Sequence, residues 1–273
     1  MMTDQAGKYE HFLALHQGPE PLLMPNAWDR GSAVLLASLG FGAVATTSSG
    51  FAATLGQLDN SVSRDQALEH SRIMADAVSV PVSADLENCF ADDPAGVAET
   101  VRLATATGLA GCSVEDATGR EDDPIYEPGL AAERVAAAVE AAHGSGPRLV
   151  LTARAENFLH GRRDLKDTIT RLQAYQEAGA DVLYAPGLTE PADIREVVRS
   201  VDRPVNVVTL AGTPDVAQLS EAGVRRISVG GAFAFAAYGA LADAVRELRE
   251  QGSYGFLATA RTGREAIQAA FGD

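Results

Sequence analysis

The chain has 273 residues, of which 46% are hydrophobic, and its formal net charge at pH 7 is −15. This length is usual for one α/β barrel, and the acidic balance argues against nucleic acid and anionic membrane surfaces as partners, because both bind basic faces. The sequence contains no apolar run near the ~20 residues that span a bilayer.

Short apolar segments alternate with amphipathic segments along the whole chain. The amphipathic stretches, such as 64–78 and 94–107, repeat apolar residues near i, i+3, i+4 and i+7, which is the period of one helix face. The apolar segments are the predicted strands, and in chain order they are 22–27, 42–47, 81–85, 110–115, 148–154, 181–186, 204–209 and 225–230.

A glycine recurs between a helical segment and the strand that follows it. Gly40, Gly108, Gly179 and Gly223 hold this place, where a left-handed helix cap turns the chain back. Strands that alternate with helices in this way predict a parallel sheet covered by helices. Eight strands without a G-x-G-x-x-G after the first favour a (β/α)8 TIM barrel over an open dinucleotide-binding sheet.

The predicted barrel is one domain spanning residues 1–273. The segment 252–273 is predicted to add a C-terminal helix that caps the barrel or packs on a partner subunit. The polar N-terminus does not resemble a signal peptide. Cys89 and Cys112 lie in or near apolar strand segments, which favours a reduced, cytoplasmic protein over a disulfide scaffold.

Acidic residues gather where predicted strands end. The carboxyl ends of barrel strands form the active face, and several acids there repel one another unless a cation neutralises them. Oxygen ligands without a His or Cys cluster favour Mg²⁺ or Mn²⁺, and Mg²⁺ takes only one or two carboxylates directly. We therefore expect Asp85 to be a direct ligand, with Glu87 and Glu115 acting largely through water. The other polar residues at this face are Asp59, Asp116, Arg154 and Glu156.

Each of these residues also has a structural interpretation. For Asp116 a helix cap or turn is nearly as typical as a site role, and Arg154 is also typical of an ion pair with Glu156 or Glu115. The stretch 46–51 (TTSSGF) is an ordinary turn or a backbone anion site. Gly230 and Gly231 are typical of a tight turn, and Trp28 of packing. Asp29 is either a helix cap or a site residue. His160 is the one histidine near the active face.

Five stretches together resemble the isocitrate lyase/phosphoenolpyruvate mutase superfamily over nearly the whole chain. LLMPNAWDRGSAVLLASLGFGAVATTSSG resembles its opening strand, helix and substrate-binding Ser-Gly turn, and LGQLD resembles the segment with an acid near the metal. SADLENCF resembles its Asp-x-Asp metal strand, here Asp-x-Glu, and SVED its Glu-Asp strand. ARAENFLHGRRDLKDTITRLQAYQEAGAD resembles its Arg-bearing strand, lid-side loop and long helix.

The resemblance implies a (β/α)8 barrel, a Mg²⁺ ion and a 2-oxo or 2-hydroxy acid as substrate. Ser49, Gly50 and Phe51 would hold the substrate carboxylate, and Arg154 would bind a carboxylate or oxyanion. The resemblance also implies a homo-oligomer, a tetramer or a dimer, that exchanges C-terminal helices. The acids that would hold Mg²⁺ and its waters are Asp59, Asp85, Glu87 and Glu115.

The chain departs from the superfamily in its lid. The isocitrate and methylisocitrate lyases carry a Lys-Lys-x-Cys-Gly-His motif after the Glu-Asp strand, whereas ATGREDDPIYEP has neither Cys nor His. Thr118 and Arg120 are only loose counterparts of the polar lid in the phosphonate enzymes, and Pro186 stands where those enzymes carry a His. The general acid/base of the lyases is therefore missing.

We predict a metal-dependent carbon–carbon lyase that cleaves a small 2-oxo or 2-hydroxy (di)carboxylic acid through a metal-stabilised enolate. Oxaloacetate decarboxylation fits best, because it needs no acid before the bond breaks. The predicted catalytic residues are Arg154, Glu115 and Asp59, and Asp85 also contacts substrate. The alternatives are isocitrate or methylisocitrate cleavage, cleavage or rearrangement of a phosphonopyruvate C–P bond, and a weakly catalytic protein that binds a 2-oxo acid such as 2-oxoglutarate.

Overall fold

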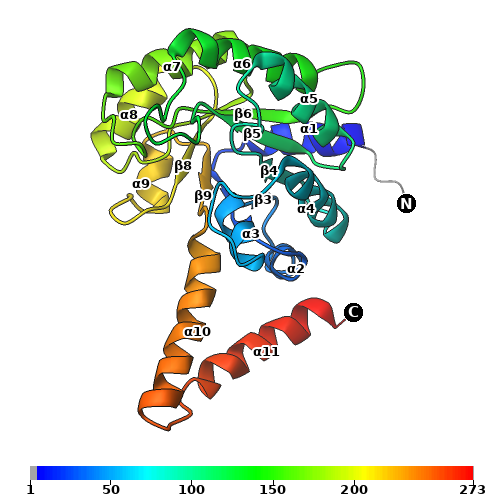
Figure 1. The fold of residues 1–273 in the computed structure, drawn as a ribbon, viewed down its shortest axis with the longest axis vertical. Helices are drawn as coiled ribbons and strands as arrows, with labels where there is room; N and C mark the ends of the chain where they lie inside the picture. Colours follow the sequence, from blue (N-terminus) through cyan, green and yellow to red (C-terminus); the bar gives the residue numbers. More distant parts are fainter. Residues whose placement is uncertain (1–4, 273) are drawn as a thin grey trace.

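The computed structural model describes residues 5–272, and its strands form one parallel sheet in the order β1-β9-β8-β7-β6-β5-β4-β3-β2 (Figure 1). The predicted strand 22–27 is split at Pro25 into β1 and β2. β1 pairs with β9 and β2 pairs with β3, so the sheet closes and the predicted TIM-type barrel is confirmed. The strands are β1 Leu22–Met24, β2 Asn26–Ala27, β3 Val44–Thr46, β4 Val82–Asp85, β5 Gly111–Glu115, β6 Val150–Arg154, β7 Val182–Tyr184, β8 Val205–Val208 and β9 Arg226–Ser228.

Helices surround the barrel and begin at the caps that the sequence supplies. Ser63 and Asp215 form capping boxes, and Pro94 and Pro128 occupy the first turns of their helices. The four predicted joint glycines all have positive φ, from 87° to 102°. The helices are α1 Gln5–Leu15, α2 Arg30–Ser38, α3 Ser48–Thr54, α4 Arg64–Ala77, α5 Pro94–Thr105, α6 Pro128–Ala142, α7 Leu165–Glu177, α8 Pro191–Ser200, α9 Val216–Glu221, α10 Ala232–Glu250 and α11 Leu257–Phe271.

Helix α1 covers the end of the barrel at which the strands begin. Tyr9 and Phe12 pack with Leu22, Val150 and Val182 in a buried apolar cluster. The opposite end, where the strands finish, is left for the polar residues of the candidate site.

The predicted C-terminal helix is present, and it belongs to a pair. Figure 1 shows α10 standing away from the barrel and α11 turning back from its far end. Ala234 is the one buried residue described in α10, and none is described in α11. Over the described residues, no helix is both long and apolar enough to cross a membrane. The large apolar side chains left exposed on this pair are Phe233, Phe235, Tyr238, Leu241, Val245, Leu248, Leu257, Ile267 and Phe271.

Gly111 allows α1 to sit close to the barrel, which predicts a specific stability loss. A Cβ added there would lie 2.7 Å from the Val150 carbonyl oxygen and 2.8 Å from the Phe12 ring. We expect Gly111→Ala to lower the free energy of unfolding by about 1–3 kcal/mol through overpacking, measured as a fall in the thermal midpoint.

The matched control is Gly129→Ala in α6, where the added methyl group meets nothing within 4 Å. This variant should unfold at the wild-type midpoint or slightly above it, because Ala favours the helix. Equal midpoints for the two variants would contradict the close packing of α1.

Candidate active site

A cavity of about 190 Å³ opens at the carboxyl ends of the strands. It is smaller than the ~300–1,000 Å³ sites that take drug-sized ligands, so it suits a small organic molecule. The polar residues that line it at the mouth include Thr46, Ser48, Ser49, Asp59, Asp85, Arg154 and Tyr184.

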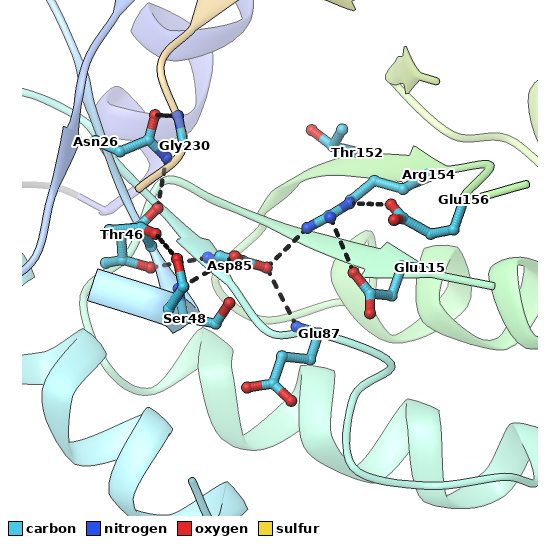
Figure 2. Close-up of polar contacts among 12 residues, drawn as sticks. Asn26, Thr46, Ser48, Asp85, Glu87, Glu115, Thr152, Arg154, Glu156 and Gly230 are labelled. Carbon is cyan, nitrogen blue, oxygen red and sulfur yellow. Dashed lines mark hydrogen bonds and ion pairs between the residues drawn. The ribbon is translucent and has the colours of Figure 1, made fainter. Parts of the chain in front are cut away.

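Asp85 ends β4 at the centre of this group (Figure 2). Its carboxylate accepts the Ser48 backbone N–H at 3.2 Å and Nη1 of Arg154 at 2.9 Å. Its own backbone N–H donates to Oγ1 of Thr46 at 2.8 Å. Because Thr47 caps α3, Ser48 is the first helical residue, and its N–H is free to reach the carboxylate.

Arg154 binds three carboxylates at once. Besides Asp85, it contacts Glu115 at 3.0 Å through Nη2 and Glu156 at 2.7 Å through Nε (Figure 2). The β5–β6 register places Glu115 directly beside Arg154. Burial opposes the arginine's charge, but the three carboxylates outweigh it and raise the pKa of Arg154. The ion pairs considered for Arg154 therefore exist, and Glu115 acts on the cavity through Arg154 rather than by lining it.

Glu87 points in another direction. It has a left-handed φ of 50°, and Figure 2 shows its side chain directed away from Arg154. Glu87 lines a neighbouring cavity of about 10 Å³ together with Phe51 and His70, and Asp85 lines both cavities. Burial, and then the negative charge of Asp85, raise the pKa of Glu87 to about 8.

The stretch 46–51 is not an ordinary turn, because Thr46 ends β3, Thr47 caps α3 and residues 48–51 form the first turn of that helix. Of its predicted carboxylate-binding residues, Ser49 lines the cavity, whereas Gly50 and Phe51 do not. Gly50 is needed for packing, since a Cβ there would lie 2.6 Å from Thr47 and 2.9 Å from Trp28. The Phe51 ring stacks on His70 with 3.8 Å between ring centroids.

Asp59 reaches the cavity from the loop after α3. Partial removal from water, and then the charge of Asp85, raise the pKa of Asp59. His160 is exposed and does not line the cavity.

Two other predicted acids have structural roles. Asp116 is buried and accepts hydrogen bonds from Arg171 at 3.0 Å, from the Tyr175 hydroxyl at 2.6 Å and from the Glu156 N–H at 2.8 Å. Asp29 caps α2 in a reciprocal pair with Ser32.

The structure adds residues that sequence reasoning missed. The amide of Asn26 accepts from the N–H groups of Val229 and Gly230 and donates to the Thr46 carbonyl, which ties β9 to β3 where the barrel closes. Polar residues also line the cavity below the mouth. These residues are Ser83, Ser113, Thr152, Asn206, Arg226 and Ser228. The sequence offers a signal for Thr152, because it precedes Arg154 by two residues on the same strand.

The acids are not gathered into a closed metal cage. Within the described part of the chain, no three Asp, Glu, His or Cys side chains converge closely enough to hold an ion by themselves. Arg154 lies between Asp85 and Glu115, and Glu87 is turned aside. Asp85 and Asp59 are the acids that line the main cavity.

Comparison with known proteins agrees with this architecture. A family model, phosphoenolpyruvate phosphomutase, matches residues 12–249. A crystal structure of a putative lyase/mutase from Burkholderia cenocepacia J2315 is 52% identical, covers 97% of this chain and 95% of that chain, and superposes with a TM-score of 0.93.

Two relatives have names that state an enzyme activity. The 2-methylisocitrate lyase of Escherichia coli K12 is 30% identical over 71% of this chain and 68% of its own. The oxaloacetate decarboxylase of Pseudomonas fluorescens Pf-5 is 28% identical over 82% of this chain and 79% of its own. The chain belongs to the phosphoenolpyruvate phosphomutase family, within the isocitrate lyase/phosphoenolpyruvate mutase superfamily that its motifs resemble.

Proposed function

We propose that the protein is a metal-dependent carbon–carbon lyase that decarboxylates a small 2-oxo acid of the oxaloacetate type. The observation that carries this proposal is the Asp85–Arg154 pair at the mouth of a small, polar cavity. The similarity to an oxaloacetate decarboxylase supports the same reaction.

The residues at the mouth fit a divalent ion such as Mg²⁺, or Mn²⁺. All the donors are oxygens, which hard cations prefer. Mg²⁺ usually keeps several waters and takes one or two carboxylates, so Asp85 would be the direct ligand and Asp59 and Glu87 would act through water. Glu115 would act by holding Arg154. Burial, and then the charge of Asp85, raise the pKa values of Glu87 and Asp59, so a bound cation would favour the loss of their protons. When bound, the ion would supply Lewis-acid polarisation of a substrate oxygen.

Arg154 would orient the 2-oxygen of the substrate. Glu115 and Glu156 hold its guanidinium in place, so the donor needs little reorganisation when charge develops on that oxygen. Ser49 would orient a substrate carboxylate at the cavity wall, and Asp59 closes the rim. Such positioning is a large part of the rate in bond-cleavage reactions.

The loop after β5 favours decarboxylation over isocitrate-type cleavage. Residues 117–127 fold back on themselves through the Ala117–Ile125 bridge, and Arg120 pairs with Asp92 at 3.1 Å. The loop contains neither Cys nor His. In decarboxylation the C3–C4 bond breaks, CO₂ leaves, and the electron pair stays on the three-carbon fragment, which water protonates afterwards. No acid is required before that bond breaks.

The helix pair α10–α11 supports a homo-oligomer. Phe235, Leu241 and Leu248 are exposed by 53%, 60% and 47%, and they lie along a helix that leaves the barrel. Exposed apolar surface of this kind is typical of an interaction site. We propose that a second copy of the chain covers it by exchanging C-terminal helices.

The first test is pyruvate release from oxaloacetate, measured above the background of Mg²⁺ alone. We expect turnover by the wild type with Mg²⁺, loss of turnover in EDTA, and a fall of about 100-fold or more in kcat/KM for Asp85→Ala, because the variant lacks the direct ligand.

Asp76→Ala is the matched control, because Asp76 is an exposed acid on α4 that pairs with Arg72. It should keep wild-type turnover. If the wild type releases no pyruvate above background, oxaloacetate decarboxylation is wrong. Methylisocitrate, phosphonopyruvate and binding of 2-oxoglutarate would then be assayed in that order.

The oligomer is tested by light scattering. The wild type should have a mass that is a multiple of the 28.5 kDa chain, and Leu241→Glu should dissociate it, because the substitution places a charge in the covered apolar face. Leu103→Glu on α5, where the leucine is 38% exposed, should leave the mass unchanged. A monomeric wild type would refute helix exchange.

A further inference from the structure

Tyr184 ends β7 and lines the cavity on the side that faces α3. With β1 and β2 counted as one strand, β7 stands four strands from β3 in either direction around the closed barrel. The turn that opens α3 comes directly after β3, and its residues Ser48 and Ser49 line the same cavity. Tyr184 therefore stands across the mouth from that turn.

The ring of Tyr184 is held against Arg154. The β6–β7 register sets these two residues side by side, and Cζ of Arg154 lies 5.2 Å from the centroid of the ring. A guanidinium over an aromatic face is attracted by the negative charge of that face. Because three carboxylates hold Arg154 in place, the same contact restrains the ring.

The hydroxyl of Tyr184 keeps its proton at neutral pH. Burial raises the pKa of Tyr184, and the charges of Glu156 and Asp85 act in the same direction. The charge of Arg154 and a hydrogen bond with the Ser228 side chain lower the pKa but do not outweigh burial. Tyr184 is therefore a proton donor, and not a phenolate, when the cavity is empty of substrate.

A buried cation stands ready to stabilise the phenolate that proton donation would leave. Arg226 lies at the floor of the cavity, 3% exposed, and its guanidinium donates to the neutral side chains of Asn206 at 2.9 Å and Thr152 at 3.0 Å. Burial lowers the pKa of Arg226 to about 9, and Tyr184 acts against this shift, so the two groups interact electrostatically. Arg226 stays charged at neutral pH and would favour the anionic form of its neighbour.

The other proton-bearing groups that line the cavity are less suited to this role. Asp85 is paired with Arg154, and Asp59 reaches the rim from the loop after α3. Thr46 accepts a hydrogen bond from the Asp85 N–H, and it is an aliphatic alcohol, a weaker acid than a phenol. The loop 117–127, which has neither Cys nor His, does not line the cavity.

We propose that Tyr184 is the acid that delivers a proton to C3 of the enolate left by carbon–carbon cleavage. The choice of this carbon rests on the proposed function. The retained carboxylate lies at the turn that opens α3, and the 2-oxygen lies beside Arg154 and Asp85. C3 is then directed across the mouth, toward Tyr184.

The step is balanced by one proton from water. The electron pair of the enolate double bond forms the new C3–H bond, the C2–O bond becomes a carbonyl, and the O–H bond of Tyr184 breaks. The phenolate then takes a proton from water at the mouth, so water is the source and Tyr184 carries the proton to the carbon. A positioned acid of this kind contributes about 10²–10⁴-fold to the step that it serves. Loss of CO₂ comes earlier and does not need it.

The test separates proton delivery from bond cleavage. Exchange of the pyruvate C3 hydrogens in D₂O is followed by NMR with Mg²⁺ present, and oxaloacetate consumption is followed by absorbance. The wild type should exchange these hydrogens above the background of Mg²⁺ alone. Tyr184→Phe should lower the exchange about 100-fold or more and keep most of the oxaloacetate consumption, because the enolate then leaves and is protonated in solution.

Tyr254→Phe is the matched control, because Tyr254 is 63% exposed in the connection between α10 and α11. It should equal the wild type in both measurements. Phe at position 184 keeps the ring beside Arg154, so this variant should fold, and its thermal midpoint checks that it does.

A tyrosine that only supports the structure would lower both rates together in Tyr184→Phe, and that result would overturn the proposal. Undiminished exchange in this variant would also overturn it, and loss of exchange in Asp59→Asn would then place the acid at the rim. A wild type without exchange above background would overturn it as well. Exchange that depends on Tyr184 in a protein that does not consume oxaloacetate would keep the acid and remove the proposed reaction.

Discussion

The structure depends on how one guanidinium is shared among several carboxylates at the barrel mouth. Arg154 binds Asp85, Glu115 and Glu156, and these contacts link β4, β5 and β6 at the level where chemistry would occur. One cation faces three carboxyl groups, and burial raises the pKa values of Glu115 and Glu156. Excess negative charge here is therefore relieved by protons or by a further cation in the cavity. The same contacts keep Arg154 rigid, as a positioned donor must be.

The acids that Arg154 does not reach are held apart by the backbone. Glu87, Cys89 and Phe90 all have φ between 50° and 60°, a conformation that is unfavourable for residues other than glycine. Buried Arg134 binds the loop through the carbonyl oxygens of Asn88 and Ala91. This loop sends Glu87 away from Arg154, so burial and the charge of Asp85 favour the protonated, neutral form of Glu87.

Sequence reasoning predicts the features that periodicity and strand ends determine. Asp85 and Arg154 end apolar segments, and the parallel register brings them to one face. Glu87 lies beyond the strand, where a left-handed backbone decides the direction of its side chain. The pattern around Gly50 indicates a turn glycine, but close packing against Trp28 is what requires it. Such reasoning misses Arg226, because this residue stands at the beginning of a strand. The direction of its side chain into the barrel depends on the register with Asn206.

The two arginines of the cavity therefore differ in role, and Arg226 is buried whereas Arg154 is partly exposed. Arg154 is surrounded by acids and offers an oriented donor with little net positive charge around it. Arg226 is surrounded by neutral groups and keeps its whole charge, which a low-dielectric interior screens weakly. An anion that enters this cavity meets repulsion at the mouth and attraction at the floor. A cation bound at the mouth would remove the repulsion without weakening the attraction, so metal and anionic substrate should bind cooperatively.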